Sequence, residues 1–96
     1  MAALLITYDL HDETYSDDVL GFIKQGKWKK VTKSSYVVIR NETPFNTVTA
    51  IRKLTKSENE KGKHNVTVCV LTVRKPFNGL VTPDVTAWLD ENLPDE

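Results

Sequence analysis

Residues 3–9 read Ala-Leu-Leu-Ile-Thr-Tyr-Asp, an almost unbroken apolar run that stops at Asp9. A run of this kind, without alternating polar side chains, is typical of a strand buried on both faces in the middle of a sheet. It is too short to span a bilayer, no basic residue precedes it, and no small-residue cleavage site follows it. We therefore predict a central β-strand here rather than a membrane anchor or a signal peptide.

The residues after this strand carry the signals of a helix over residues 17–25. Ser16 is placed to cap the first turn, and Asp17 and Asp18 lie where the helix dipole favours acidic side chains. Gly26 is a stop signal just beyond the last turn, because glycine readily adopts the left-handed conformation that ends many helices.

The pattern then changes from helix to sheet. Residues 28–32 and 35–40 are rich in β-branched and aromatic side chains, and the polar pair Lys33 and Ser34 separates them. Because two short strands joined by a polar turn pair with each other most readily, this stretch predicts a β-hairpin.

A second helix is predicted after the hairpin. Thr43 is placed as its N-cap, and Pro44 suits the first helical position because a residue there needs no backbone N–H. Apolar residues recur in this helix at three-residue intervals. We expect them to form one buried stripe, made of Phe45, Val48, Ile51 and Leu54.

A fourth strand and a last helix complete the pattern. Valines alternate with other residues over 66–71, as in a strand. Thr82 and Pro83 then open a helix whose Trp88 we expect in the core or at a dimer contact. The single cysteine, Cys69, lies in the fourth strand and is expected to pack there.

This order of elements predicts the fold class. A strand, a helix, two strands, a helix and a strand give an α+β, ferredoxin-like βαββαβ sandwich with a four-stranded antiparallel sheet, here with an added C-terminal helix. With 40% hydrophobic and 27% charged residues in 96 residues, the composition is that of one globular domain spanning residues 1–96. One cysteine allows no internal disulfide, which, with the lack of a signal peptide, favours the cytoplasm.

The net charge is zero, but the charges are segregated along the chain. Residues 1–23 hold five acidic side chains and no lysine or arginine, whereas residues 24–40 hold six basic side chains and no acid. The basic strip and its aromatic neighbours form a candidate nucleic-acid surface, since ammonium groups meet phosphates and aromatic rings stack on bases. Its residues are Lys27, Trp28, Lys29, Lys30, Lys33, Tyr36 and Arg40. The alternative is a solvated sheet edge, where lysines discourage strand pairing.

Three stretches, taken in order along the chain, carry a family resemblance. Residues 5–10, Leu-Ile-Thr-Tyr-Asp-Leu, are similar to the first strand of the small CRISPR-associated protein called number two, which ends in an aspartate. Gly26 and Trp28 with residues 35–39 resemble the central hairpin of its SinR-like relatives, and residues 77–93 resemble their C-terminal part. The resemblance covers almost the whole chain and implies a ferredoxin-like homodimer.

The resemblance also implies a range of functions. Some better-known members of the family are metal-dependent nucleases, others are non-catalytic scaffolds that hold DNA beside an integrase, and a relative, virulence-associated protein D, acts on RNA. This chain departs from the CRISPR members in its loop His11-Asp12-Glu13, which has no nearby arginine, and in its terminal helix, which replaces a short strand that helps their dimerisation. A stand-alone or mobile-element protein is therefore favoured.

Asp9 is the principal candidate for chemistry. A carboxylate at a strand end, brought near its symmetry mate in a dimer, would offer two hard oxygen ligands to Mg²⁺ or Mn²⁺, which polarises a phosphate. The alternative is an aspartate that ends the strand and accepts backbone hydrogen bonds. His11 is a candidate general base, since imidazole exchanges protons near neutral pH. Asp12 and Glu13 are read as a solvated acidic loop.

Three functions therefore stay open at the level of sequence. One is a homodimer that binds RNA or DNA and cleaves it with a metal ion at Asp9. A second is a non-catalytic module that uses the same dimer to bind nucleic acid or a host protein, and a third binds only a basic protein partner, through the acidic residues 12–18. No membrane association is expected. No phosphate-binding glycine loop, paired nucleophile and histidine, or zinc-ligand spacing indicates another enzyme class.

Overall fold

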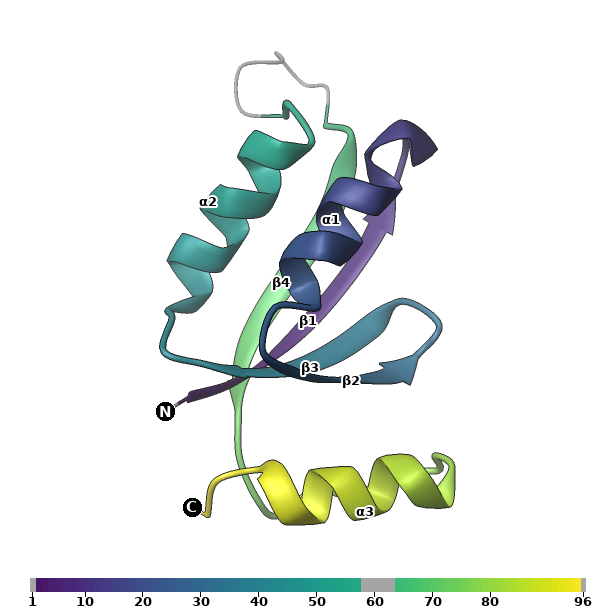
Figure 1. Ribbon diagram of the computed structural model, residues 1–96, viewed down its shortest axis with the longest axis vertical. Helices are drawn as coiled ribbons and strands as arrows, with labels where there is room; N and C mark the ends of the chain where they lie inside the picture. The colour runs from purple at the N-terminus through teal and green to yellow at the C-terminus, as the bar shows by residue number, and fades with distance from the viewer. Residues whose placement is uncertain (1, 58–63, 96) are drawn as a thin grey trace.

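The computed structural model describes residues 2–57 and 64–95. Within them the chain forms an α+β fold with a four-stranded antiparallel sheet and three α-helices (Figure 1). The strands are β1 (Ala2–Leu10), β2 (Lys27–Thr32), β3 (Ser35–Arg40) and β4 (Val66–Val73). The helices are α1 (Ser16–Ile23), α2 (Pro44–Leu54) and α3 (Pro83–Asn92), with a short 3-10 turn, η1 (Glu13–Tyr15), before α1.

The central position predicted for β1 is confirmed. The strands lie in the order β2-β3-β1-β4, and every neighbouring pair is antiparallel. β1 pairs with β3 over Ala2–Thr7 and with β4 over Ala3–Leu10. Since α1 joins β1 to β2 and α2 joins β3 to β4, each of these helices crosses one intervening strand.

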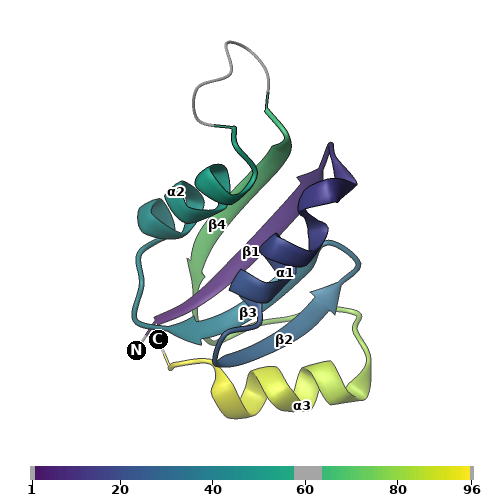
Figure 2. The same ribbon diagram turned by 45° about the horizontal axis from the view of Figure 1, so that its top comes forward.

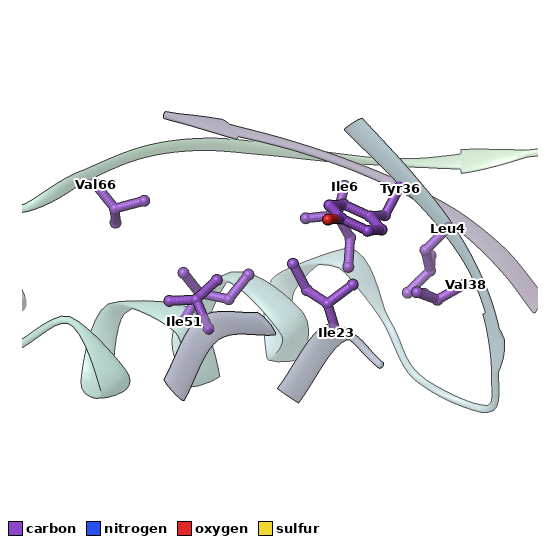
Figure 3. Close-up of a cluster of buried hydrophobic side chains, with 8 residues drawn as sticks. Leu4, Ile6, Ile23, Tyr36, Val38, Ile51 and Val66 are labelled. Atoms are coloured by element: carbon purple, nitrogen blue, oxygen red, sulfur yellow. The ribbon is translucent and has the colours of Figure 1, made fainter. Parts of the chain in front are cut away.

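One hydrophobic core lies between the sheet and the helix pair α1 and α2. Alternate residues of β1, Leu4 and Ile6, point to this first face of the sheet and are fully buried. They meet Ile23 of α1 and Ile51 of α2, which are also fully buried (Figure 3). The apolar sides of both helices are thus fixed against the central strand.

A second hydrophobic core lies on the opposite face of the sheet, under α3. Ala3, which alternates with Leu4 along β1, packs there with Val85 and Leu89 of α3. Figure 2 shows α3 beneath the sheet, on the side away from α1 and α2. Trp88 packs against this cluster and is partly buried. It therefore has the first of its two predicted positions, in the core rather than at a dimer contact. Because both faces are covered, β1 is apolar at successive positions.

The predicted stripe of α2 is wrong at Phe45. Phe45 is 77% exposed, and the buried residues of the helix are Thr47 and Ile51. An α-helix turns by about 100° per residue, so Phe45 and Leu54, nine positions apart, lie about 180° apart around the axis. A three-residue spacing sustained over the whole helix therefore cannot follow one face, whereas the four-residue step from Thr47 to Ile51 does.

The start of the first helix also differs from the prediction. Ser16 is its first residue and not its cap, and Tyr15 before it makes no side-chain cap. The cap belongs instead to the turn η1, where the Asp12 carboxylate accepts a hydrogen bond from the Thr14 backbone N–H at 3.0 Å. The helix ends at Ile23, two residues before the predicted end, and Gly26 adopts a φ of 78° three residues beyond it.

Polar contacts fasten α3 to the hairpin edge of the sheet. The Lys29 ammonium lies 2.9 Å from the Asp84 carboxylate in the first turn of α3, and the Lys27 ammonium donates to the Asn92 side-chain oxygen at 3.4 Å. A hydrogen bond from the Thr82 hydroxyl, together with Lys29, lowers the pKa of Asp84 from 3.8 to about 2.

A buried and an exposed residue of the predicted stripe give a first prediction. Replacing buried Ile51 by Ala should lower the free energy of unfolding by about 2–5 kcal/mol, because it leaves a cavity beneath the sheet. Replacing exposed Phe45 by Ala should change it by less than about 0.5 kcal/mol. Urea unfolding followed by circular dichroism measures both, and equal losses would contradict this description of α2.

The pKa of Asp84 gives a second prediction. Because this pKa is lower in the folded protein than its usual value of 3.8, the hydrogen bond from Thr82 and the contact with Lys29 stabilise the start of α3 above that value. The stabilisation should be lost as the pH falls through about 2. NMR shifts of α3 amides should therefore move between pH 4 and pH 2, and Asp84→Asn should remove that movement. An unchanged titration in this variant would refute the role of these contacts.

Candidate functional site at the end of the central strand

Asp9 lies at the exposed end of β1. Along the strand it alternates with the residues of the first core, so its side chain belongs to the second face of the sheet. Its partner across the ladder is Thr67 of β4, which is also exposed. α3 does not cover this end of the face, because the second core gathers around Ala3 and Val37 instead. The Asp9 carboxylate is therefore open to ligands.

His11 is held beside Thr67 by both nitrogens of its ring. Nδ1 lies 2.8 Å from the His64 carbonyl oxygen, which can only accept, so Nδ1 carries the proton. Nε2 lies 2.9 Å from Oγ1 of Thr67, and in the tautomer with its proton on Nδ1 the Thr67 hydroxyl donates to Nε2. The cross-strand pairing of Asp9 with Thr67 thus brings Asp9, His11 and Thr67 to one end of the sheet. Thr67 was not foreseen, because only the strand register connects it to His11.

A groove opens on the other side of Asp9, where β1 extends beyond the end of β3. It has a volume of about 510 Å³, and its lining includes Tyr8, Asp9, Glu13 and Lys33. Burial, and then the neighbouring Tyr36 and Glu13, raise the pKa of the Tyr8 hydroxyl, which stays a hydrogen-bond donor at neutral pH. Tyr8, Asp9, Glu13 and Lys33 therefore border one concave surface, with the side chains of Tyr8 and Asp9 leaving the strand on opposite faces.

The donor set around this groove suits a weakly held divalent cation. No group of three or more His, Cys, Asp or Glu side chains within residues 2–57 and 64–95 forms a metal cage. Mg²⁺, however, is commonly bound by one or two carboxylates together with substrate phosphates and water, and Asp9 and Glu13 supply two carboxylates. Asp12 is engaged elsewhere, since hydrogen bonds from Thr14 lower its pKa.

The lysines of the basic strip divide between the two faces of the sheet. Lys27 and Lys29 make the contacts to α3 described above. Lys30 is exposed on the first face, with its ammonium 5.9 Å from the Tyr36 ring centroid. Lys33 is exposed in the β2–β3 turn, beside the groove. Lys30 and Lys33 are thus the residues of the strip best placed to meet a phosphate.

The aromatic residues of the strip stack on one another. Tyr36 has its ring centroid 6.3 Å from that of Tyr8 and 6.1 Å from that of Trp28. Only 3% of Tyr36 is exposed, so its ring has no free surface for a base. Trp28 is half-buried, with the Lys24 ammonium 4.9 Å from its ring centroid. This row of rings belongs mainly to the first core.

Arg40 binds the end of α1. Its Nη2 atom donates to the carbonyl oxygens of Phe22, Ile23 and Gln25 at 3.1, 2.7 and 3.1 Å. The last carbonyls of a helix have no partners within it, and a cation also suits the negative end of the dipole. Partial burial lowers the pKa of the guanidinium, with an opposing effect from Glu42, but a group this basic stays charged. Arg40 therefore acts as a C-terminal cap.

Comparisons of the chain with models of known protein families, with curated proteins and with solved structures give no match. In the part of the chain that the structure describes, no helix is long and apolar enough to cross a membrane. The function is therefore inferred from the geometry of the site and from the sequence.

The role of Arg40 gives a third prediction. Arg40→Ala should lower the free energy of unfolding by about 1–3 kcal/mol, because three carbonyls at the end of α1 lose a charged donor. Lys30→Ala, on the neighbouring strand and exposed, should change it by less than about 0.5 kcal/mol. Chemical unfolding measures both values. If Arg40→Ala were as stable as Lys30→Ala, the capping contact would not stabilise the fold. Arg40 could then act in nucleic-acid binding instead.

Proposed function

We propose that this protein is a homodimeric nucleic-acid-binding protein with a ferredoxin-like fold and an added C-terminal helix, related to the SinR-like branch of the small CRISPR-associated proteins. The sheet order and the two helix crossings, each over one strand, support the ferredoxin-like assignment. The sequence resemblance described above supports the relationship.

One observation carries the functional part of the proposal. A single groove at the end of the central strand is bordered by Asp9, Glu13 and Lys33. Carboxylates suit a divalent cation and an ammonium group suits a phosphate, and a nucleic-acid backbone with its counterions presents both. Asp9 and Glu13 would hold Mg²⁺ or Mn²⁺ against the phosphate that Lys33 orients. The bound cation would polarise the phosphate and lower the pKa of its water.

His11 is the residue proposed to exchange a proton at this site. Its Nε2 is the acceptor atom, and it lies on the side of Thr67, across the ladder from Asp9. The hydrogen bond from Nδ1 to the His64 carbonyl fixes the ring orientation. This contact leaves Nε2 as the proton-accepting nitrogen, which would take up a proton once the Thr67 hydroxyl turns away from it.

A second candidate function is a non-catalytic module that binds nucleic acid or a host protein, as a regulator carried by a mobile element would. Four acidic side chains near the N-terminus of α1 favour it, since all are exposed and together they offer a negative surface to a basic partner. They are Asp12, Glu13, Asp17 and Asp18. Such a module uses the same groove without cleavage.

The two functions are separated by a fourth prediction. Asp9→Asn should leave the fold and the binding of labelled RNA or DNA intact, but should reduce Mn²⁺-dependent cleavage about 100-fold, because a cation ligand is lost. Asp17→Asn, outside the groove, is the matched control. Absence of cleavage by the unaltered protein under all metal conditions, with binding retained, would leave only the second function.

Charge reversal tests binding itself. Lys33→Glu should weaken nucleic-acid binding and flatten its dependence on salt, because fewer counterions are released. Lys53→Glu, an exposed lysine on α2 away from the groove, should weaken binding less. Fluorescence anisotropy at several salt concentrations measures both. Equal losses in the two variants would show that the groove is not the binding site.

A further inference from the structure

The two edges of the sheet differ sharply in their chemistry. β2 forms one edge and β4 the other. An edge strand presents unpaired backbone N–H and C=O groups, which pair readily with another strand unless charges, proline or a bulge prevent it. The two edges differ in these protections.

The β2 edge is protected. Three of its six residues are lysines, Lys27, Lys29 and Lys30. The register of its pairing with β3 shifts between Lys30 and Thr32, so the strand is irregular near its end. A second copy that paired with this edge would bring lysines close to lysines, and the irregularity would interrupt the ladder.

The β4 edge has none of these protections. Its eight residues read Val-Thr-Val-Cys-Val-Leu-Thr-Val, without a charge, a proline or a glycine. Within the described residues β1 is its only strand partner, so its outer side is unpaired. Leu71 is 47% exposed and Cys69 is exposed, so apolar side chains beside this edge reach the solvent.

The backbone groups that face outward can be identified. The His11 N–H donates to the Asn65 carbonyl, so Asn65 directs its groups toward β1. Residues alternate in this respect along an antiparallel strand, so Thr67, Cys69 and Leu71 also face β1. The groups that face away belong to Val66, Val68, Val70 and Thr72.

We propose that β4 is the dimer interface, where β4 of a second copy pairs with it antiparallel and joins the two sheets into one of eight strands. A strand that carries no charge is complementary to its own copy, because a two-fold axis then sets no like charges opposite each other. Association should stop at the dimer, because the two outer edges of the joined sheet are then the protected β2 strands, which do not pair with a third copy.

Because opposed residues must point to the same face, the two-fold axis can pass only through a residue position, and the two registers that pair most of β4 place it at Cys69 or at Val70. In one, Cys69 lies opposite Cys69 of the partner subunit and Leu71 lies opposite Thr67 of the partner subunit. In the other, Val70 lies opposite Val70 of the partner subunit and Leu71 lies opposite Cys69 of the partner subunit. In both, exposed Leu71 gains a neighbour across the new ladder, and the outward groups of Val68 and Val70 are paired.

This dimer has a consequence for the proposed cation site. The two Asp9 residues lie on the same face of the joined sheet, separated by three strand spacings and by four to six residues along the strands. With strand spacings of about 4.8 Å and a rise of about 3.4 Å per residue, the separation is roughly 20–25 Å. Each Asp9 would then hold its own cation, without sharing it.

The test is residue-resolved amide hydrogen exchange by NMR at two protein concentrations. At a concentration where about nine-tenths of the protein is dimeric, exchange at Val68 and Val70 should slow about tenfold, because it then proceeds through the monomer. Trp28 and Lys30, whose N–H groups face outward on the β2 edge, are the matched controls and should not slow. Unchanged exchange at Val68 and Val70 in a dimeric sample would overturn the proposal.

Variants give an independent readout by analytical ultracentrifugation. Thr72→Pro removes an outward N–H without removing a hydrogen bond to β1, and should abolish the dimer. Cys69→Lys keeps every backbone group but sets like charges near each other in both registers, and should abolish it too. Leu80→Glu, at a fully exposed residue in the segment before α3, should leave it intact.

The outcomes are distinct from those that test nucleic-acid binding. Loss of the dimer in Thr72→Pro and Cys69→Lys, with retention in Leu80→Glu, supports β4 pairing whether or not the protein binds nucleic acid. A monomer at all concentrations overturns it. A dimer that persists in Thr72→Pro but is lost in Leu80→Glu also overturns it, and indicates packing through the second face, which would bring the Asp9 residues together.

Discussion

The structure depends on burying both faces of the first strand. β1 lies between β3 and β4, and its successive residues Ala3 and Leu4 are both fully buried, one against α3 and the other against α1 and α2. The hairpin, the two crossing helices and the terminal helix are therefore all positioned by contacts with one short apolar segment.

Much of the fold was predictable because its signals are local. The apolar run of β1, the turn at Lys33 and Ser34, and the cap at Thr43, whose hydroxyl oxygen accepts from the Asn46 N–H at 3.1 Å, depend on near neighbours in sequence. The face of the sheet that α3 covers was not predictable, since either face of β1 was apolar. Phe45 was misplaced because apolar character alone does not reveal on which side of a helix the core lies.

The candidate site was predictable in part. Asp9 and Lys33 were identified from the sequence, and the structure places both on one groove. Their meeting, and the contact of His11 with Thr67, arise from strand register, which the sequence does not state. The basic strip was a linear pattern, but alternation along β2 sends its lysines to opposite faces, while Arg40 and Tyr36 serve the fold. Because neighbouring residues of a strand point to opposite faces of the sheet, a run of charged residues in the sequence does not by itself define one charged surface.

The central position of β1 also has a consequence during protein synthesis. This strand is made before its partners β3 and β4, which end at Arg40 and Val73. At translation rates of about 5–20 residues per second, its apolar residues wait roughly 3–13 s before both partners have been made. An apolar strand that waits for its partners offers a binding site to chaperones. The need of this chain for folding assistance therefore depends on the order of its strands rather than on its length.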